Sequence, residues 1–177
     1  MSLLPYWEIL LRLVAALLIG SAIGLDRFLH GKPAGLRTHS LVTLSAALIT
    51  IVGIDLTSRG PNPEPSDVSR IIQGIITGVG FVGGGVILQN AKTRSVRGLT
   101  TGVSLWLSAC LGVGCGAGAW AVSLTTTVLV LLVLGLGRKV ERGVERRVRV
   151  WFASGKAGED AKGIAERPGH VFADDED

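Results

Sequence analysis

The fold is decided by the segment from Gly98 to Gly137, "GLTTGVSLWLSACLGVGCGAGAWAVSLTTTVLVLLVLGLG", whose 40 residues include no Asp, Glu, Lys or Arg. A single helix of that length would be about 60 Å long, twice the roughly 30 Å thickness of a bilayer's hydrocarbon core. The segment must therefore fold back on itself, and the alternate glycines of "GVGCGAG" (Gly112–Gly118) mark the turn. We expect two membrane spans here, at about 99–111 and 119–136.

Three more apolar segments complete the set of predicted spans, at about 7–25, 38–54 and 69–89. The composition of the 177-residue chain agrees, with 47% hydrophobic and only 18% charged residues. We therefore predict an all-α integral membrane protein of the bacterial inner membrane. Its residues 1–137 are expected to form a bundle of five transmembrane helices in contact with the lipid bilayer.

The first span is expected to remain part of the mature chain. It has no basic segment before it and no small-residue cleavage site after a short apolar core, which a signal peptide would have. It carries Glu8 and Arg12, four residues apart, which can form an ion pair on one face of a helix.

Basic residues are distributed unevenly between the loops that join these spans. The second loop is mainly acidic and the fourth is uncharged, whereas the first, the third and the tail are basic. Lys and Arg accumulate in cytoplasmic loops, so five spans place the N-terminus outside and the C-terminus in the cytoplasm. The basic residues of the first and third loops are Arg27, Lys32, Arg37, Lys92, Arg94 and Arg97.

The segment after the last span is basic first and acidic last. At 138–152, valines recur every four residues between Arg and Glu side chains, which predicts a basic amphipathic juxtamembrane helix beside anionic headgroups. Residues 153–177 are rich in Gly and charge and end in "DDED", so we expect a disordered cytoplasmic tail. The membrane explains the net charge of +4 better than nucleic acid does, and no nucleic-acid partner is predicted.

Two segments of the chain are similar to each other. "GLRTHSLVTLSAAL" (Gly35–Leu48) and "GLTTGVSLWLSACL" (Gly98–Leu111) align without gaps and share seven of fourteen residues. One interpretation is that membrane insertion and a bias toward small residues produce the similarity. The other is a parallel repeat of helical hairpins, formed by spans one–two and three–four, and both interpretations remain open.

The stretch "TGVGFVGGG" (Thr77–Gly85) contains a G-x-G-x-x-G pattern, which in soluble enzymes can mark a dinucleotide site. That site needs a strand before it and a helix that opens after it, whereas this stretch lies inside an uncharged span. We therefore interpret the glycines as helix-packing positions and expect the third span to form the core of the bundle. The predicted packing glycines are Gly74, Gly78, Gly80, Gly84 and Gly85.

A polar cluster is predicted at the cytoplasmic edge of the first, second and fourth spans. Asp26 follows an apolar span directly, where an unpaired acid is expensive, and Arg37 is its expected partner, in function or as a structural latch. The starts of the second and fourth spans either bind an anion or an acidic partner, or their threonines only cap the helices. The predicted cluster comprises Asp26, Arg27, Arg37, Thr38, His39, Arg97, Thr100 and Thr101.

No catalytic, cofactor-binding or metal site is predicted. The sequence has no hydrolase triad, no nucleophile elbow and no dense group of His, Cys and carboxylate residues. Cys110 and Cys115 lie inside one apolar segment, where we expect small packing residues rather than a disulfide or a metal pair. His39 is expected to be a hydrogen-bonded packing residue rather than a ligand or a proton relay. We therefore expect a protein that is not an enzyme and has no cofactor.

Three segments together resemble the MgtC/SapB family of bacterial inner-membrane proteins. They are "IGLDR…KPAGLRTHSLV" (Ile23–Val42), "RIIQGIITGVGFVGGGVIL" (Arg70–Leu88) and "VRGLTTGVSLWLSACLGVGCGAG" (Val96–Gly118). The resemblance and its spacing cover most of residues 10–136. The chain departs from the family pattern at Asp26, where Glu is more frequent, and we expect a short member in which about 40 residues replace a long soluble C-terminal domain.

The resemblance implies a regulatory membrane protein linked to adaptation to low magnesium and, in pathogens, to virulence through survival inside macrophages. It implies action on other membrane proteins, including the F-type ATP synthase. From the residues, we expect a non-enzymatic regulator that binds membrane proteins through glycine-lined helix faces. The alternative is a small transporter or channel component for Mg²⁺ or protons, with Asp26, Arg37 and His39 along its path. Homo-oligomerisation is compatible with either hypothesis.

Overall fold

The computed structural model describes residues 4–60, 65–90 and 95–137, together with Val144 and Arg147. The chain divides into two compact units, Met1–Leu134 and Gly135–Asp177. The predicted tail at 153–177 lies outside the described residues, as does the predicted helix at 138–152 except for the two residues named above.

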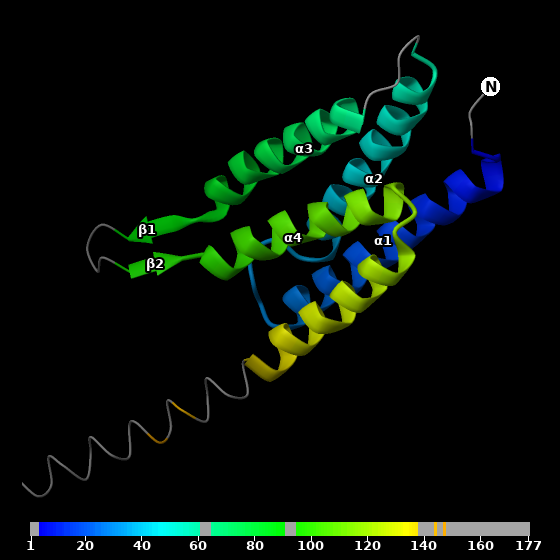
Figure 1. The fold of residues 1–177 in the computed structure, drawn as a ribbon. Coiled ribbons are helices and arrows are strands. Elements are labelled where there is room, and N and C mark those ends of the chain that lie inside the picture. The colour runs from blue at the N-terminus through cyan, green and yellow to red at the C-terminus, as the bar shows by residue number, and fades with distance from the viewer. Residues whose placement is uncertain (1–3, 61–64, 91–94, 138–143, 145–146, 148–177) are drawn as a thin grey trace, which may run out of the picture. The chain divides into compact units, whose positions relative to one another are not determined.

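Five helices and one short hairpin make up the described part of the chain (Figure 1). They are α1 (Tyr6–Leu29), α2 (Leu36–Ser58), α3 (Pro65–Val86), β1 (Leu88–Asn90), β2 (Ser95–Arg97), α4 (Leu99–Gly116) and a last helix, Trp120–Gly137. β1 and β2 pair antiparallel, with Leu88 opposite Arg97. α2 and α4 contact each other, and each of them also contacts both α1 and α3. These two helices therefore form the centre of the α1–α4 arrangement.

Four helices are long and apolar enough to cross a membrane: α1, α2, α4 and Trp120–Gly137. α3 is not one of the four, since Arg70, Gln73 and its glycines lower its mean hydropathy. The prediction of membrane spans is thus confirmed for four helices. A fifth span, the orientation of the chain and the hairpin repeat stay predictions.

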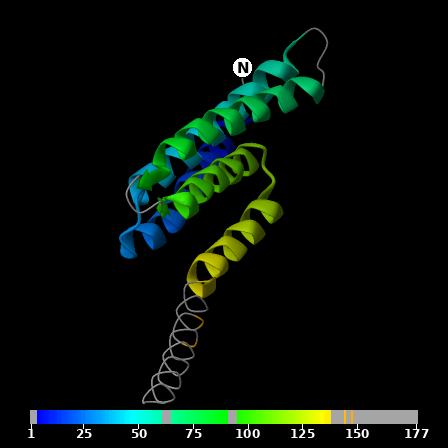
Figure 2. The ribbon, with the colours of Figure 1, turned by 90° about the vertical axis from the view of Figure 1, so that its left-hand side faces the viewer.

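α4 is longer than the span predicted at 99–111. The helix continues through Gly112 to Gly116, and the chain reverses at 117–119, where Gly118 adopts φ +76° (Figure 2). Gly112 and Gly116 do not mark a turn but pack against α2: a Cβ on Gly116 would lie 2.6 Å from the carbonyl oxygen of Ala47. Their role is close packing between helices.

The third predicted span, 69–89, is wrong at its end. α3 stops at Val86 after three consecutive glycines, and the next residues form β1 instead of a further helical turn. Pairing with β2 satisfies the backbone groups of this connection. Gly98, with φ +85°, then leads the chain into α4, a conformation that residues with a Cβ rarely adopt.

Glycine pairs bring α1 and α4 close to α2. Gly20 and Gly24 in α1 stand four residues apart, as do Gly112 and Gly116 in α4, and a Cβ at any of these positions would collide with α2. At Gly24 it would lie 2.6 Å from Leu36 Cα. Small residues at this spacing allow helix backbones to approach closely. A buried apolar core between these helices and the Trp120–Gly137 helix consists of Ala16, Ile19, Ile23, Ala47, Leu111, Cys115 and Val130.

The prediction that the third span forms the core of the bundle is wrong. α3 packs through Ile71, Ile75, Val79 and Gly83, which recur every four residues, so one face of the helix meets its neighbours. Within the described part of the chain, nothing lies within 4 Å of a Cβ added at any of the five glycines expected to pack. These exposed glycines are Gly74, Gly78, Gly80, Gly84 and Gly85.

Candidate functional site

Arg27 is a buried cation in the last turn of α1, with 2% of its surface exposed. Its Nη2 donates a 2.8 Å hydrogen bond to Oγ1 of Thr101, in the first turn of α4. A cation in the last turn of a helix interacts favourably with the helix dipole, and a hydrogen bond from a charged donor is stronger than a neutral one. Arg27 therefore ties the end of α1 to the start of α4.

His39 is fully buried one turn inside α2. Its Nε2 lies 3.1 Å from Oγ of Ser104 in α4, and its Nδ1 lies 3.1 Å from the carbonyl oxygen of Gly35. The hydroxyl of Ser104 also lies 2.9 Å from the carbonyl oxygen of Thr101, which is a second acceptor within its reach. His39 is thus a hydrogen-bonded packing residue, as its position in the sequence predicts.

These contacts fix the tautomer of the neutral His39 ring. A carbonyl oxygen only accepts, so the contact with Gly35 requires a proton on Nδ1. In the neutral imidazole, Nε2 then accepts from the Ser104 hydroxyl, whereas in the imidazolium Nε2 donates to it and the hydroxyl donates to Thr101. Both states fit the same heavy-atom positions, and they differ in the proton on Nε2 and in the direction of the Ser104 hydroxyl.

We call Arg27, His39, Thr101 and Ser104 the Arg27–His39 cluster. It joins α1, α2 and α4 at the end of the bundle where α1 ends, and Arg27 also interacts electrostatically with His39. The cluster has a cation and hydroxyls but no carboxylate, so it suits an acceptor group or a proton better than a metal cation. In the part of the chain that the structure describes, no three His, Cys, Asp or Glu residues are grouped to hold a metal ion.

The structure brings together three of the eight residues predicted for the polar cluster, Arg27, His39 and Thr101. Asp26 is half-buried, and its carboxylate Oδ1 lies 3.6 Å from Nδ1 of His30, its neighbour four residues later. Thr38 is half-buried, while Arg37, Arg97 and Thr100 are exposed. The pairing of Asp26 with Arg37 and the anion site at the two helix starts stay predictions.

Ser104 is the cluster residue that sequence reasoning missed. It is 4% exposed and lies one helical turn after Thr101, with Ser108 one turn further on. The three residues form a stripe of small polar side chains on the face of α4 that is buried in the bundle. The spacing of this stripe in an otherwise apolar span is the signal that could have identified Ser104.

A second buried cation lies at the opposite end of α1. Arg12 is 9% exposed, and its Nη2 pairs with Glu8 at 2.5 Å, which confirms the predicted ion pair. Its Nη1 donates a 2.7 Å hydrogen bond to the carbonyl oxygen of Gly116, at the end of α4. Cations stabilise the exposed carbonyl groups at a helix C-terminus. Arg12 therefore fixes the end of α4 as Arg27 fixes its start.

Comparison with known proteins identifies a family for most of this chain. The sequence profile of the MgtC family matches residues 13–143. Protein SrpB of Synechococcus elongatus is 43% identical over 57% of this chain and 59% of its own length. Protein SapB of Bacillus subtilis is 42% identical over 60% of this chain and 46% of its own length, and protein MgtC of Salmonella typhimurium is 38% identical over 64% and 44%. The chain thus spans about half the length of these relatives. No solved structure matches it.

Proposed function

This chain belongs to the MgtC family and is a multi-pass protein of the bacterial inner membrane, and on that premise we propose that it is a non-enzymatic regulator that binds the transmembrane helix of another membrane protein. The observation that carries the proposal is the set of five exposed glycines on α3. The relatives that carry the name MgtC motivate a role in adaptation to low magnesium. The family resemblance alone suggests the F-type ATP synthase as the partner and a link to virulence.

The exposed glycines make α3 suited to a helical partner. Gly74 and Gly78 stand four residues apart, as do Gly80 and Gly84, and this spacing lets a second helix approach the α3 backbone closely. The contact between Gly83 and Gly102 of α4 shows the same kind of approach within the chain. Each glycine in a helix interior costs about 1 kcal/mol relative to alanine. Within the described residues, no contact at these glycines offsets this cost. Packing against a partner helix would offset it.

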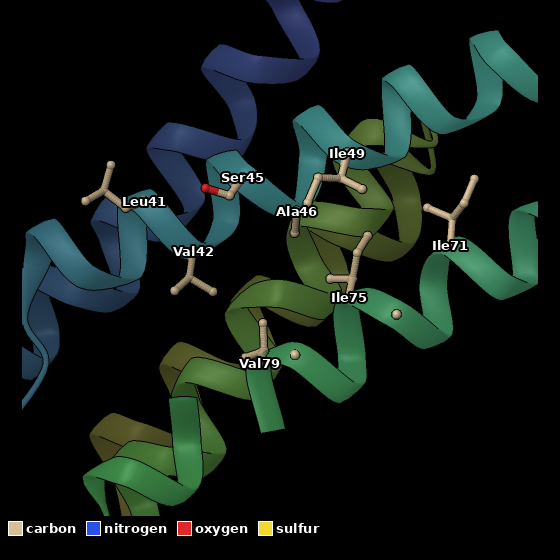
Figure 3. Close-up of a pocket in the computed structure, with 10 residues that line it drawn as sticks. Leu41, Val42, Ser45, Ala46, Ile49, Ile71, Ile75 and Val79 are labelled. Carbon is tan, nitrogen blue, oxygen red and sulfur yellow. The ribbon is translucent and has the colours of Figure 1, made fainter. Parts of the chain in front are cut away.

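An apolar groove runs beside two of these glycines, Gly74 and Gly78, between α2 and α3 (Figure 3). Its volume is about 520 Å³. In the close-up, Val42 and Ile49 project from α2 toward the side of α3 that carries Ile75 and Val79. The remaining lining residues are Leu41, Ser45, Ala46, Ile71, Gly74 and Gly78. The groove would accept apolar side chains of a partner helix that lies along α3.

The test is co-purification from native membranes of cells grown with limiting magnesium. We expect wild-type protein to recover a stoichiometric membrane partner and Gly78→Leu to lose it, because leucine would occupy the helix approach. Val128→Leu is the matched control, since Val128 is exposed on the Trp120–Gly137 helix. The proposal fails if no partner is recovered, or if both variants retain it equally at normal expression levels.

The second candidate function is a small transporter or channel component, which the Arg27–His39 cluster favours because buried ionisable groups in membrane spans often mark ion pathways. The buried guanidinium of Arg27 counts against passage of Mg²⁺ at this point, since like charges repel. Flux of Mg²⁺ or protons into liposomes containing the purified protein, above that of empty liposomes, would favour transport over regulation.

A further inference from the structure

The α1–α2 and α3–α4 hairpins are packed through the same positions. A Cβ on Gly20 of α1 would lie 2.8 Å from the carbonyl oxygen of His39 in α2. A Cβ on Gly83 of α3 would lie 3.3 Å from the carbonyl oxygen of Gly102 in α4. Gly83 follows Gly20 by 63 residues, and Gly102 follows His39 by the same number. This is also the separation between the two similar sequence segments at the starts of α2 and α4.

The contacts between the two hairpins have the same separation. α1 binds α4 at the carbonyl oxygen of Gly116, and α3 packs against α2 at Gly53, which precedes Gly116 by 63 residues. Ala46 of α2 and Ala109 of α4, another pair with this separation, are buried in one apolar cluster. These contacts support the predicted parallel repeat, in which α1 corresponds to α3 and α2 to α4 about an axis along the helices.

The last helix packs against α1 and α4. Its Val130 is buried in one apolar cluster with Ala16 of α1 and Leu111 of α4, and Leu131 and Leu134 pack against this cluster. In the parallel repeat, the equivalent position is the one that contacts α3 and α2. The chain therefore fills one of two equivalent positions with its own helix.

The second of these positions coincides with the apolar groove between α2 and α3 (Figure 3). Ala15 and Ala16 belong to the α1 side of the filled position, and the residues 63 places later, Gly78 and Val79, both line the groove. Ala16 is fully buried, whereas a Cβ added at Gly78 would meet nothing within 4 Å among the described residues. The groove thus has the place of a helix site that the described residues leave open.

The last helix runs in the same direction as α1. α1 is antiparallel to α4, since Arg12 near its start contacts the end of α4 and Arg27 near its end contacts the start of α4. The last helix is also antiparallel to α4, because the chain reverses at 117–119. A helix in the equivalent groove would therefore run parallel to α3 and antiparallel to α2, with its N-terminal half beside the end of α2.

We propose that the groove between α2 and α3 is a second site of the kind that the last helix fills, and that the transmembrane helix of the regulated partner lies in it parallel to α3. This inference rests on the proposed function and adds the direction of the partner helix and the chemistry of its side chains. The lining of the groove carries no charge, and Ser45 is its one polar side chain. The partner should therefore present uncharged aliphatic side chains, as the last helix does with Val130, Leu131 and Leu134.

Photo-crosslinking in living cells tests the direction, with the crosslinking residue placed at Leu41 or at Ile49. Both are exposed residues of α2 that line the groove, and they lie about 12 Å apart along the helix. We expect both positions to capture the same partner helix. Peptide mass spectrometry of the adducts should place the Ile49 adduct nearer to the N-terminus of that helix than the Leu41 adduct.

Two tryptophan variants test the location, each combined with the crosslinking residue at Leu41. Ile49→Trp fills the groove and should reduce the adduct at least about tenfold, because the larger side chain would clash with the partner helix. Leu48→Trp is the matched control and should retain the adduct. Leu48 is 51% exposed and Ile49 is 49% exposed, but Leu48 lies outside the groove.

Three results would overturn this inference and leave the proposed function standing. They are the reversed order of the two adducts along the partner helix, an equal loss of adduct in Ile49→Trp and Leu48→Trp, and a partner captured from Phe81 but from neither Leu41 nor Ile49. No adduct with another membrane protein from any of these three positions would overturn the proposed function, and this inference with it.

Discussion

The guanidinium of Arg27 at the end of α1 donates a 2.8 Å hydrogen bond to Thr101 at the start of α4, 74 residues later in the chain. Both side chains are at least 98% buried. Together with the contact between His39 and Ser104, this bond holds α1, α2 and α4 together at one end of the bundle. The Arg27–His39 cluster therefore has a structural role, whatever its further function.

Replacing Arg27 with alanine should destabilise the protein by about 3 kcal/mol, because it removes a charge-assisted hydrogen bond and leaves a cavity. Equilibrium unfolding in mixed micelles measures the effect. Arg37→Ala, at an exposed position of α2, serves as the control and should change the free energy of unfolding by less than about 0.5 kcal/mol. Equal effects of the two substitutions would contradict the structural role of Arg27.

The contact between His39 and Ser104 should appear as a coupling energy of about 1 kcal/mol in a double-mutant cycle with His39→Ala and Ser104→Ala. The cycle compares the unfolding free energies of the two single variants and the double variant. A parallel cycle with Ser58→Ala, an exposed residue at the other end of α2, should give a value near zero. A coupling energy near zero in the His39–Ser104 cycle as well would show that this contact does not contribute to stability.

Alanine should lower stability at Gly116 but not at Gly78. Gly116→Ala places a Cβ 2.6 Å from the carbonyl oxygen of Ala47 and should lower the melting temperature. Gly78→Ala places its Cβ in open space and raises helix propensity by up to about 1 kcal/mol, so the melting temperature should stay constant or rise. A lower melting temperature for Gly78→Ala alone would show that this face of α3 packs within the chain.

Gly118→Ala should destabilise the protein by more than Gly31→Ala does. Both glycines have positive φ angles, +76° and +60°, so both substitutions strain the backbone by about 1 kcal/mol. A Cβ at Gly118 would also lie 2.8 Å from Nη2 of Arg12, whereas the space beside Gly31 is open. The difference in unfolding free energy therefore reports the Arg12 contact, and equal losses would argue against it.

The sequence predicts the four spans well because hydrocarbon excludes unpaired charge. An uncharged segment such as Gly98–Gly137 can satisfy its backbone groups only as helices, and its length requires two of them. The pair Glu8 and Arg12 is predicted for a similarly local reason, since four residues separate them on one helix. These features depend on composition and on spacing within one segment.

The packing partners could not be predicted in the same way. Gly20 and Gly24 have the same spacing as Gly74 and Gly78, yet among the residues that the structure describes only the first pair contacts a neighbouring helix. The spacing shows that a close approach is allowed, and tertiary packing decides whether a helix uses it. Likewise, the contact between Arg27 and Thr101 joins distant segments, so the sequence indicates the polar residues but not their pairing.

The central claim is that the exposed glycine surface of α3 binds a helix of another membrane protein. Photo-crosslinking in living cells tests it most directly, with the crosslinking residue placed at Phe81, which is 86% exposed on α3, or at Val133, which is 70% exposed on the Trp120–Gly137 helix. We predict a specific adduct with another membrane protein from position 81 but not from position 133, and its loss when Gly78→Leu is added. No adduct from position 81, adducts only with a second copy of this chain, or the same adducts from both positions would contradict the claim.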